Sequence, residues 1–296
     1  MYIQKNGAVY LTGKESFIPS QTLECGQCFR HSEIDKEYYV IPAFGKLLKI
    51  KQEKEALIFD TTLEEFERLW LDYFDLKQDY EKIKQNLSED SVLKQAIAYA
   101  SGIHILNQEF FECLISFIIS QNNTIPRIKR IIKNICEKYG EFLGEIEGEK
   151  YFSFPTTKQL SKATAEDFMA CNAGFRGSYI VDAVKKIESG EVDFSEFSSL
   201  STEQLREKLM TIKGVGPKVA DCVLLFSCGR KEVFPVDVWV KRVMSYFYFH
   251  EEETSIKEIS SLAAEKYGIY AGFAQQYLFY YARENKIGKK KKAEQK

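Results

Sequence analysis

The sequence lacks any apolar stretch of membrane-spanning length. Its most apolar runs, CLISFII (113–119) and CVLLF (222–226), have only the length of buried helical segments. The N-terminal MYIQKNGAVYLTGKES also lacks the charged region and apolar core of a secretory signal. We therefore expect no membrane partner and an intracellular protein, in the cytoplasm or nucleoid of a bacterium or the nucleus of a eukaryote.

The seven cysteines do not make up a complete metal site. Cys25 and Cys28 have the two-residue spacing of metal and redox motifs, but no second cysteine pair or histidine cluster supplies the other ligands. Cys113 and Cys222 fall within apolar helical runs, where a free cysteine behaves as a small hydrophobic residue. This pattern favours a reducing compartment and predicts no bound metal.

The chain also lacks the excess of basic residues that is typical of nucleic-acid-binding proteins. Its formal net charge is -2, from 41 Lys and Arg against 43 Asp and Glu. The last segment, KIGKKKKAEQK (286–296), carries +5, which leaves -7 on residues 1–285. We expect this tail to be solvated and disordered, with ordering on DNA as the alternative.

The composition is that of a globular protein with a large core, because 45% of the 296 residues are hydrophobic and 22 are Phe. Residues 36–52 and 56–62 read as antiparallel strands, and the pattern becomes helical from Thr62, a candidate N-cap. Further helices are expected near 91–100, 108–120, 125–139, 157–170, 177–189, 202–211, 217–228, 236–248, 255–266 and 271–285. The fold class is therefore α+β and mostly helical.

The expected organisation is a small antiparallel sheet with flanking helices (1–105), a helical region (106–285) and the basic tail (286–296). GEFLGEIEGEK (140–150) reads as a loop between two helical subdomains, because it alternates Gly and Glu.

A helix-hairpin-helix pattern at about 202–228 is the most informative stretch. A helix ends near Lys213, Gly214-Val215-Gly216 follows, and Pro217 suits the first position of the next helix. Two glycines can adopt positive φ and expose backbone N–H groups beside a helix N-terminus, which makes a candidate site for a DNA phosphate. The alternative is an ordinary tight turn between helices.

Lys218 and Asp237 are the candidate catalytic pair. Lys218 follows Pro217 in the first helical turn, where desolvation and the helix dipole favour the neutral amine that a nucleophile needs. Asp237 begins another helix after VFPV. A solvated lysine and an ordinary N-cap are the alternatives for the two residues taken singly.

The segment LMTIKGVGPKVADC…VFPVDVWV closely resembles the bifunctional 8-oxoguanine DNA glycosylase/lyase family of the helix-hairpin-helix, Gly-Pro-Asp superfamily. LECGQCFR (23–30), ECLISFIISQNNTIPRI (112–128), NAGFRGSYI (172–180) and YAGFAQQYLFYYA (270–282) also resemble that family's motifs. The resemblance implies a small sheet joined to two helical subdomains with a cleft between them, and a monomer that acts on double-stranded DNA.

The resemblance implies a role for each matching residue. Lys218 would attack C1′ of the damaged nucleotide and form a Schiff base, while Asp237 would stabilise positive charge on the sugar. The flipped base would lie between Cys222 and Phe279, with Gln275 at its Watson–Crick edge and the Gly26 carbonyl accepting the N7 hydrogen of 8-oxoguanine. Asn122, Arg127 and Arg176 would contact the cytosine left opposite, and Phe175 would act as a wedge.

Two positions depart from the pattern. Trp239 stands where eukaryotic members have His, and Ala282 where they have Asp; both are expected to flank the pocket entrance. The chain also lacks the C-terminal four-cysteine cluster of related endonuclease III-type glycosylases, so we expect no iron–sulfur cluster and no other cofactor. A glycosylase for another damaged purine and a non-catalytic hairpin-type DNA-binding protein remain the alternative functions.

Overall fold

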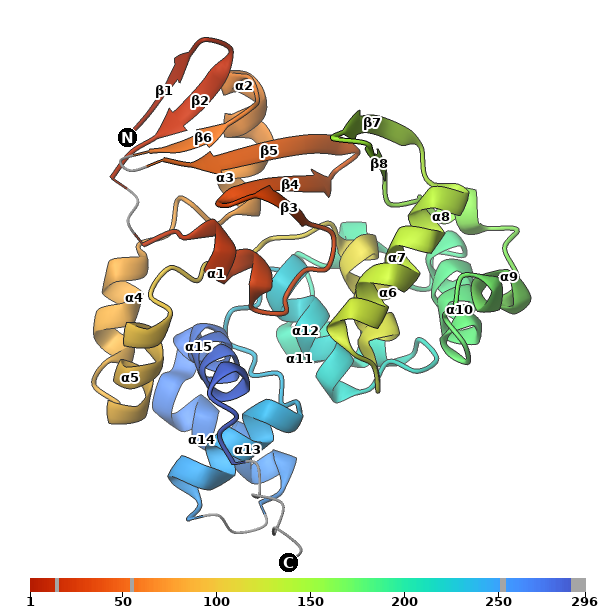
Figure 1. Cartoon of the computed structure of the whole chain (residues 1–296). Coiled ribbons are helices and arrows are strands. Elements are labelled where there is room, and N and C mark those ends of the chain that lie inside the picture. The colour runs from red at the N-terminus through yellow and green to blue at the C-terminus, as the bar shows by residue number, and fades with distance from the viewer. Residues whose placement is uncertain (14–15, 54–55, 251–253, 289–296) are drawn as a thin grey trace, which may run out of the picture.

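The computed structural model describes residues 1–13, 16–53, 56–250 and 254–288. Its N-terminal part is a six-stranded antiparallel sheet of order β1-β2-β6-β5-β4-β3, at the top of Figure 1. The strands are β1 (Tyr2–Lys5), β2 (Ala8–Leu11), β3 (Ser32–Asp35), β4 (Tyr38–Ala43), β5 (Lys46–Gln52) and β6 (Leu57–Phe59). The α+β, mostly helical class expected from the sequence is confirmed.

An aromatic core fixes the first helices against the sheet. Thr62 caps α2 (Leu63–Glu65) by accepting a hydrogen bond from the Glu65 N–H, and one wide helical turn (Phe66–Trp70) leads into α3 (Leu71–Tyr73). Phe66 and Trp70 are fully buried, and the Phe66 ring meets that of Phe59 on β6 with the ring centroids 4.9 Å apart.

The remaining helices share a second, larger core. They are α4 (Tyr80–Leu87), α5 (Ser91–Tyr99), α6 (Phe110–Ser120), α7 (Ile125–Tyr139), α8 (Thr157–Leu160), α9 (Ala165–Ala170), α10 (Arg176–Glu188), α11 (Thr202–Met210), α12 (Pro217–Ser227), α13 (Val238–Tyr248), α14 (Ile256–Tyr267) and α15 (Ala271–Glu284). The short helix α1 (Pro19–Glu24) instead contributes Leu23 to the core of the sheet. In Figure 1, α4, α5 and α13–α15 lie on one side below the sheet and α6–α12 on the other. Because α5 packs on α15, residues 80–105 belong to the helical core. The expected N-terminal part, 1–105, had included them.

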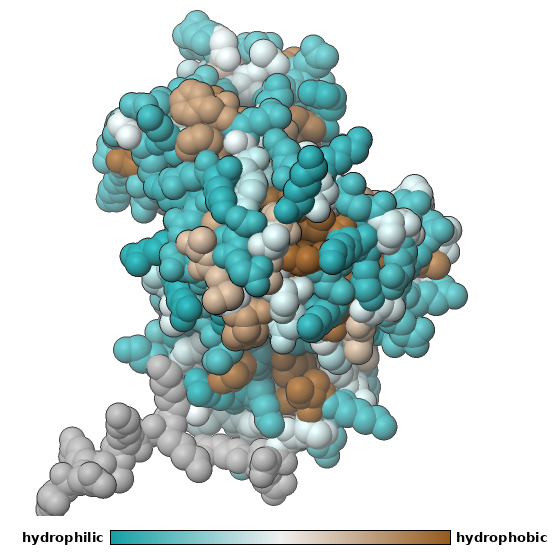
Figure 2. Space-filling view, turned by 90° about the vertical axis from the view of Figure 1, so that its right-hand side faces the viewer, coloured by the Kyte–Doolittle hydropathy of each residue, from teal (hydrophilic) through white to brown (hydrophobic). Residues whose placement is uncertain are grey.

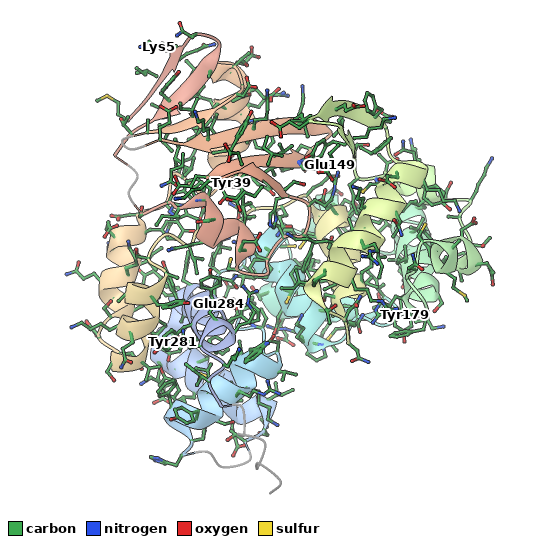
Figure 3. The ribbon with its side chains drawn as sticks, viewed as in Figure 1. Lys5, Tyr39, Glu149, Tyr179, Tyr281 and Glu284 are labelled. Carbon is green, nitrogen blue, oxygen red and sulfur yellow. The ribbon has the colours of Figure 1, made fainter. Side chains whose placement is uncertain are left out.

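The expected loop at 140–150 is wrong, because this segment forms a β-hairpin. β7 (Phe142–Ile146) pairs with β8 (Glu149–Phe152) around Glu147 and Gly148, whose φ values are 51° and 83°. Two successive positive φ values define the type I′ turn that joins hairpin strands. The hairpin lies beside β5, as Figure 1 shows, and Glu149 (Figure 3) accepts a hydrogen bond from Lys133 Nζ on α7 at 2.8 Å.

Two other expectations need correction. The sequence patterns missed β1, β2, β3, α1 and α4, and the single helix expected at 157–170 is two short helices, α8 and α9. Each of these two helices has its own capping box, at Thr156 and Thr164, so the chain restarts rather than continues between them. The basic tail from residue 289 lies outside the described residues.

The surface seen from the side of α8–α10 is mainly hydrophilic, with apolar side chains gathered in small patches (Figure 2). Within the described ranges, none of the helices combines the length and the apolar character needed to span a bilayer.

Candidate active site

The hairpin brings α11 and α12 together around one left-handed residue. Gly214 has φ +79°, and a Cβ there would lie 2.2 Å from the ring of Tyr179 on α10. Gly216 instead has φ -101° and is the extended N-cap of α12, with Pro217 at its first position. The expectation of positive φ at both glycines is therefore wrong for Gly216. Val215 between them is buried.

Lys218 and Asp237 lie at the N-termini of α12 and α13 and line the same cavity. The Lys218 ammonium is 5.1 Å from the centroid of the Phe117 ring, a cation–π contact with α6. Asp237 is the N-cap of α13, because its Oδ1 accepts a hydrogen bond from the Val240 N–H at 2.7 Å. Burial raises the pKa of the Asp237 carboxyl, and the capping bond and the charge of Lys218 oppose that rise.

The cavity has a volume of about 180 Å³ and is bounded by five parts of the chain, within 26–29, 117–128, 218–226, 235–239 and 275–283. The residues matched to the damaged-base pocket all line it: Gly26, Cys222, Gln275 and Phe279. Burial raises the pKa of the Cys222 thiol to about 11, so this group is neutral. The cavity thus places an amine and a carboxylate at the edge of an apolar, ring-lined space.

Gln275 supplies a polar group that no residue in the described part of the chain binds. Its side chain is 4% exposed, and its Oε1 accepts no hydrogen bond from any residue that the structure describes. A buried acceptor without a donor is costly, so this oxygen is available to a donor that enters the pocket. The pocket therefore offers an acceptor to an N–H group of a bound molecule.

Gly26 closes the cavity from the side of the sheet domain. Its φ is +80°, and a Cβ there would lie 3.0 Å from Phe279 Cε1 on α15. The backbone of residue 26 and the Phe279 ring are thus in close contact, which brings residues from the two ends of the chain to one side of the pocket.

The residues matched to the opposite base lie outside the pocket. Asn122, Arg127 and Phe175 are exposed, and Asn122 has a left-handed φ of 46°. Asn122 also lines a larger groove of about 1220 Å³, which meets the small cavity at Lys218 and Asp237. The groove runs past the starts of α12, α13 and α14.

Arg176 differs from the other three residues matched to the opposite base and wedge because it is buried, with 3% exposed surface. Its Nε donates to the Gln121 carbonyl at 2.9 Å, and its Nη2 donates to the same carbonyl and, at 3.0 Å, to that of Asn122. Its Nη1 donates to the Ala173 carbonyl at 3.3 Å. Four of its bonds thus go to backbone, and one of the five guanidinium N–H groups is left over within the described part of the chain.

The two departures from the family pattern have different surroundings. Trp239 lines the cavity, and the Arg242 guanidinium lies 5.0 Å from its ring centroid. Ala282 is fully buried in the helical core and does not line the cavity, so the expectation that it flanks the entrance is wrong.

Arg283 is a pocket residue that the sequence patterns did not indicate. It lines the cavity one helical turn beyond Phe279, and its guanidinium lies 5.4 Å from the centroid of that ring. The i, i+4 continuation of Gln275 and Phe279 along α15 was the available signal.

The CxxC motif holds no metal-type cluster in this fold. Cys25 and Cys28 are buried free thiols, and burial raises the pKa of both. In the parts of the chain that the structure describes, no group of three or more His, Cys, Asp or Glu residues is placed to hold a metal ion.

A helix-hairpin-helix, a lysine at the start of its second helix and an aspartate that caps the next helix together define a class of DNA repair proteins. Residues 115–267 match the HhH-GPD superfamily of base excision DNA repair proteins, and residues 9–114 match the N-terminal domain of 8-oxoguanine DNA glycosylase. Together the two matches cover the chain from β2 to the end of α14.

The chain belongs to the 8-oxoguanine DNA glycosylase family, as expected from its motifs. It is 30% identical to the N-glycosylase/DNA lyase of Saccharomyces cerevisiae, over 90% of this chain and 83% of the yeast protein. It is 32% identical to a probable N-glycosylase/DNA lyase of Methanothermobacter thermautotrophicus, over 72% and 73% of the two chains.

A solved structure of the same kind is also similar. The Clostridium acetobutylicum 8-oxoguanine glycosylase/lyase, in complex with double-stranded DNA containing cytosine opposite 8-oxoguanine, is 43% identical with a TM-score of 0.93. The similarity covers 97% of this chain and 99% of the clostridial one.

Proposed function

We propose that this protein excises 8-oxoguanine paired with cytosine from duplex DNA and then cleaves the strand by β-elimination. The observation that carries the proposal is the single cavity that unites Lys218 and Asp237 with Gly26, Cys222, Gln275 and Phe279. Membership of the family and the likeness to a glycosylase/lyase solved with this lesion support it.

In the proposed reaction the base is first flipped into the cavity, because its glycosidic bond is not accessible within the stack. The Lys218 amine attacks C1′, the glycosidic bond breaks, and the base leaves with the bonding electrons and takes up a proton. Asp237, as a carboxylate, stabilises the positive charge that develops on the sugar. The amine then loses a proton, the C1′–O4′ bond breaks, and O4′ takes up a proton, so the sugar ring opens and C1′ forms the Schiff base with Lys218. Removal of a C2′ proton from the Schiff base then expels the 3′ phosphate.

Recognition of the lesion would use both polar sides of the pocket. The Gln275 Oε1, which lacks an internal partner, would accept from the Watson–Crick edge of the purine, and the Gly26 carbonyl would accept the N7 hydrogen that guanine does not have. One such hydrogen bond is worth roughly 1–3 kcal/mol, so it discriminates but does not alone give high selectivity.

Opposite-base recognition would fall mainly to exposed groups. Asn122 and Arg127 would contact the cytosine, Phe175 would wedge into the stack, and Arg176 would hold the Asn122 backbone and offer the base its one remaining N–H. Backbone N–H groups at Gly214, Val215 and Gly216 would bind a phosphate of the lesion strand. The chemistry needs no cofactor, because the nucleophile and the carboxylate come from the chain, and the protein would act as a monomer wherever the cell keeps its DNA.

Trapping of the Schiff base tests the proposal. The protein is mixed with borohydride and duplexes that carry 8-oxoguanine opposite each of the four bases, or an alkylated purine opposite its normal partner. We expect a covalent adduct, fastest opposite cytosine, that is lost in Lys218→Gln and kept in Lys213→Gln, a lysine of the same hairpin. Strand cleavage by Lys218→Gln should fall by at least about 1000-fold.

An adduct formed only with the alkylated purine would replace the proposed substrate with another damaged base. If the unaltered protein forms no adduct with any duplex, the lyase reaction is wrong. If the adduct survives in Lys218→Gln, a different amine is the nucleophile.

A further inference from the structure

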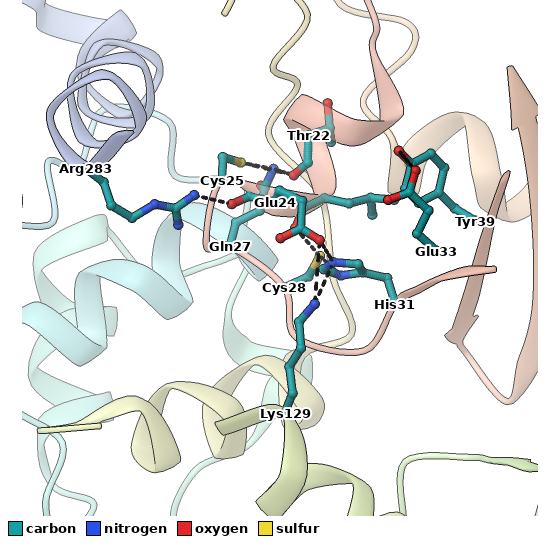
Figure 4. Close-up of polar contacts among 11 residues, drawn as sticks. Thr22, Glu24, Cys25, Gln27, Cys28, His31, Glu33, Tyr39, Lys129 and Arg283 are labelled. Atoms are coloured by element: carbon teal, nitrogen blue, oxygen red, sulfur yellow. Dashed lines mark hydrogen bonds and ion pairs between the residues drawn. The ribbon is translucent and has the colours of Figure 1, made fainter. Parts of the chain in front are cut away.

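The loop that carries Gly26 is held from two sides by a group of charged residues, of which only Arg283 lines the base cavity. We call Glu24, His31, Lys129 and Arg283 the Glu24 clamp; Figure 4 shows them together. Glu24 is two residues before Gly26 and ends α1, while Lys129 is on α7 and Arg283 on α15. Groups from α1, α7 and α15 therefore meet at Glu24, next to the loop that carries Gly26.

The side chain of Glu24 is bound by His31, just before β3, and by Lys129 on α7. Its Oε1 lies 2.7 Å from His31 Nε2 and 3.7 Å from Lys129 Nζ, and the two nitrogens are 2.9 Å apart. His31 is almost fully buried, with 2% of its side chain exposed, and its hydrogen bond lowers the pKa of the Glu24 carboxyl to about 2. The ionised carboxylate is thus tied to a buried imidazole and a lysine.

The backbone of the same loop is bound from α15. Arg283 Nη2 donates to the Glu24 carbonyl at 2.6 Å, and Gln276 Nε2 donates to the Cys25 carbonyl at 2.9 Å. These two peptide groups come directly before Gly26, so their positions set the direction of the next carbonyl. The guanidinium of Arg283 also lies over the Phe279 ring, which packs against Gly26.

A single carbonyl that reads one base hydrogen must be held at its place before the base arrives. A shift of about 1 Å in such a group can cost on the order of 100-fold in rate. If the loop had to rearrange on binding, the energy of that rearrangement would offset the hydrogen bond that distinguishes 8-oxoguanine from guanine. Arg127, on the first turn of α7, is two residues before Lys129. The clamp therefore joins the helix that faces the opposite base to the loop that faces the lesion.

We propose that the Glu24 clamp is a positioning element that sets the Gly26 carbonyl for recognition of the damaged base. The proposal rests on the proposed function and deepens it, because it assigns part of the selectivity for an oxidised purine to Glu24, His31 and Lys129, which do not line the base cavity. Lys129, His31 and Glu24 act through Gly26, and Arg283 acts through both Gly26 and Phe279.

The test compares two duplexes that are identical except at one position, which holds either 8-oxoguanine or an abasic site opposite cytosine. Cleavage of both requires Lys218, but the abasic site has no base to place against Gly26. In single-turnover cleavage, Lys129→Met should lower the rate on 8-oxoguanine about tenfold and leave the abasic-site rate within about twofold. Glu24→Gln should likewise lower the ratio of the rate on 8-oxoguanine to the rate on the abasic site.

Lys133→Met is the matched control. Lys133 is one turn further along α7 and makes a comparable ion pair, at 2.8 Å, with Glu149 on the hairpin. Its removal should leave both rates unchanged. A general loss of stability would lower the two rates together, and the melting temperature of each variant reports that loss separately.

Equal falls on the two duplexes, or no fall on either, would overturn the clamp proposal. Failure of the proposed function has another signature, since the unaltered protein would then cleave the abasic site but not 8-oxoguanine. In that case the ratio is measured on the damaged purine that the protein does excise, and the same two outcomes decide the clamp.

Discussion

The proposed pocket for the damaged base and the residues proposed to contact the opposite base are built in contrasting ways. The pocket is enclosed, and α12, α13, α15 and the Gly26 loop bring its groups into one cavity. Of the residues proposed to contact the opposite base, Asn122, Arg127 and Phe175 are exposed. Arg176 is buried, and its guanidinium donates hydrogen bonds to backbone carbonyls. Under the proposed function the lesion side is thus preassembled, whereas the exposed residues of the other side would take their partner groups from the DNA.

The largest expected effect comes from a change of Asp237, whose proposed catalytic carboxylate is also the N-cap of α13. Asp237→Asn keeps an oxygen for the Val240 N–H but loses the charge, so excision should fall roughly 100-fold or more. Asp237→Ala should lose the same activity and, in addition, about 1 kcal/mol of helix capping. Single-turnover excision and melting temperature separate the two roles.

The stability of the Asn variant should change in the opposite direction. Burial raises the pKa of Asp237 in the folded state, so ionisation destabilises the fold, and stability is lost as the pH rises through that raised pKa. An amide has no such loss, and Asp237→Asn should therefore melt at or above the temperature of the unaltered protein at neutral pH. Equal destabilisation by Asn and Ala would show that the carboxylate itself stabilises the fold.

A second test compares the two arginines of the opposite-base region. Arg176→Ala removes the donor from three backbone carbonyls and should lower the free energy of unfolding by roughly 2–3 kcal/mol. Arg127→Ala should change stability by no more than about 0.5 kcal/mol, because its side chain is exposed. It should instead reduce the preference for cytosine about tenfold.

The measurements are denaturant unfolding and excision rates opposite each base. If Arg127→Ala left the base preference intact while Arg176→Ala abolished it in a folded protein, the direct reader would be Arg176. The division between an exposed reader and a buried support would then be reversed.

The smallest expected effect distinguishes the two hairpin glycines. Gly214→Ala combines a positive φ with a clash against Tyr179 and should lower stability by roughly 1–3 kcal/mol and weaken DNA binding. Gly216→Ala should be nearly neutral for stability, since its φ is negative and no atom lies within 4 Å of the added Cβ. Thermal melting and duplex titration of both variants check this, and equal effects would contradict it.

Local signals in the sequence were sufficient for the helices of the site. Pro217 and Asp237 mark the starts of α12 and α13, because a first-position proline and an N-cap are determined within one turn. The resemblance to the family then supplied which residues to bring together, and the cavity contains each of the pocket residues it named.

Features that depend on distant segments were not predictable. Burial of Arg176 is determined by carbonyls that are 54 and 55 residues away in the sequence, and the role of Arg283 by a carbonyl that is 259 residues away. The hairpin at 142–152 was missed because its Gly and Glu residues resemble a loop, although Glu147-Gly148 fits a two-residue turn. Strands of four residues such as β1 and β2 are too short to give a clear alternation.

The orphan acceptor of Gln275 ties ligand recognition to the thermodynamics of the empty enzyme. A buried oxygen that no described residue satisfies contributes less to the stability of the free protein than one with an internal donor would. A base with matching N–H groups would supply that hydrogen bond, so part of the affinity would come from a contact that the protein alone does not make. Selection for the lesion and selection for a rigid, heat-resistant fold therefore act against each other at this one side chain.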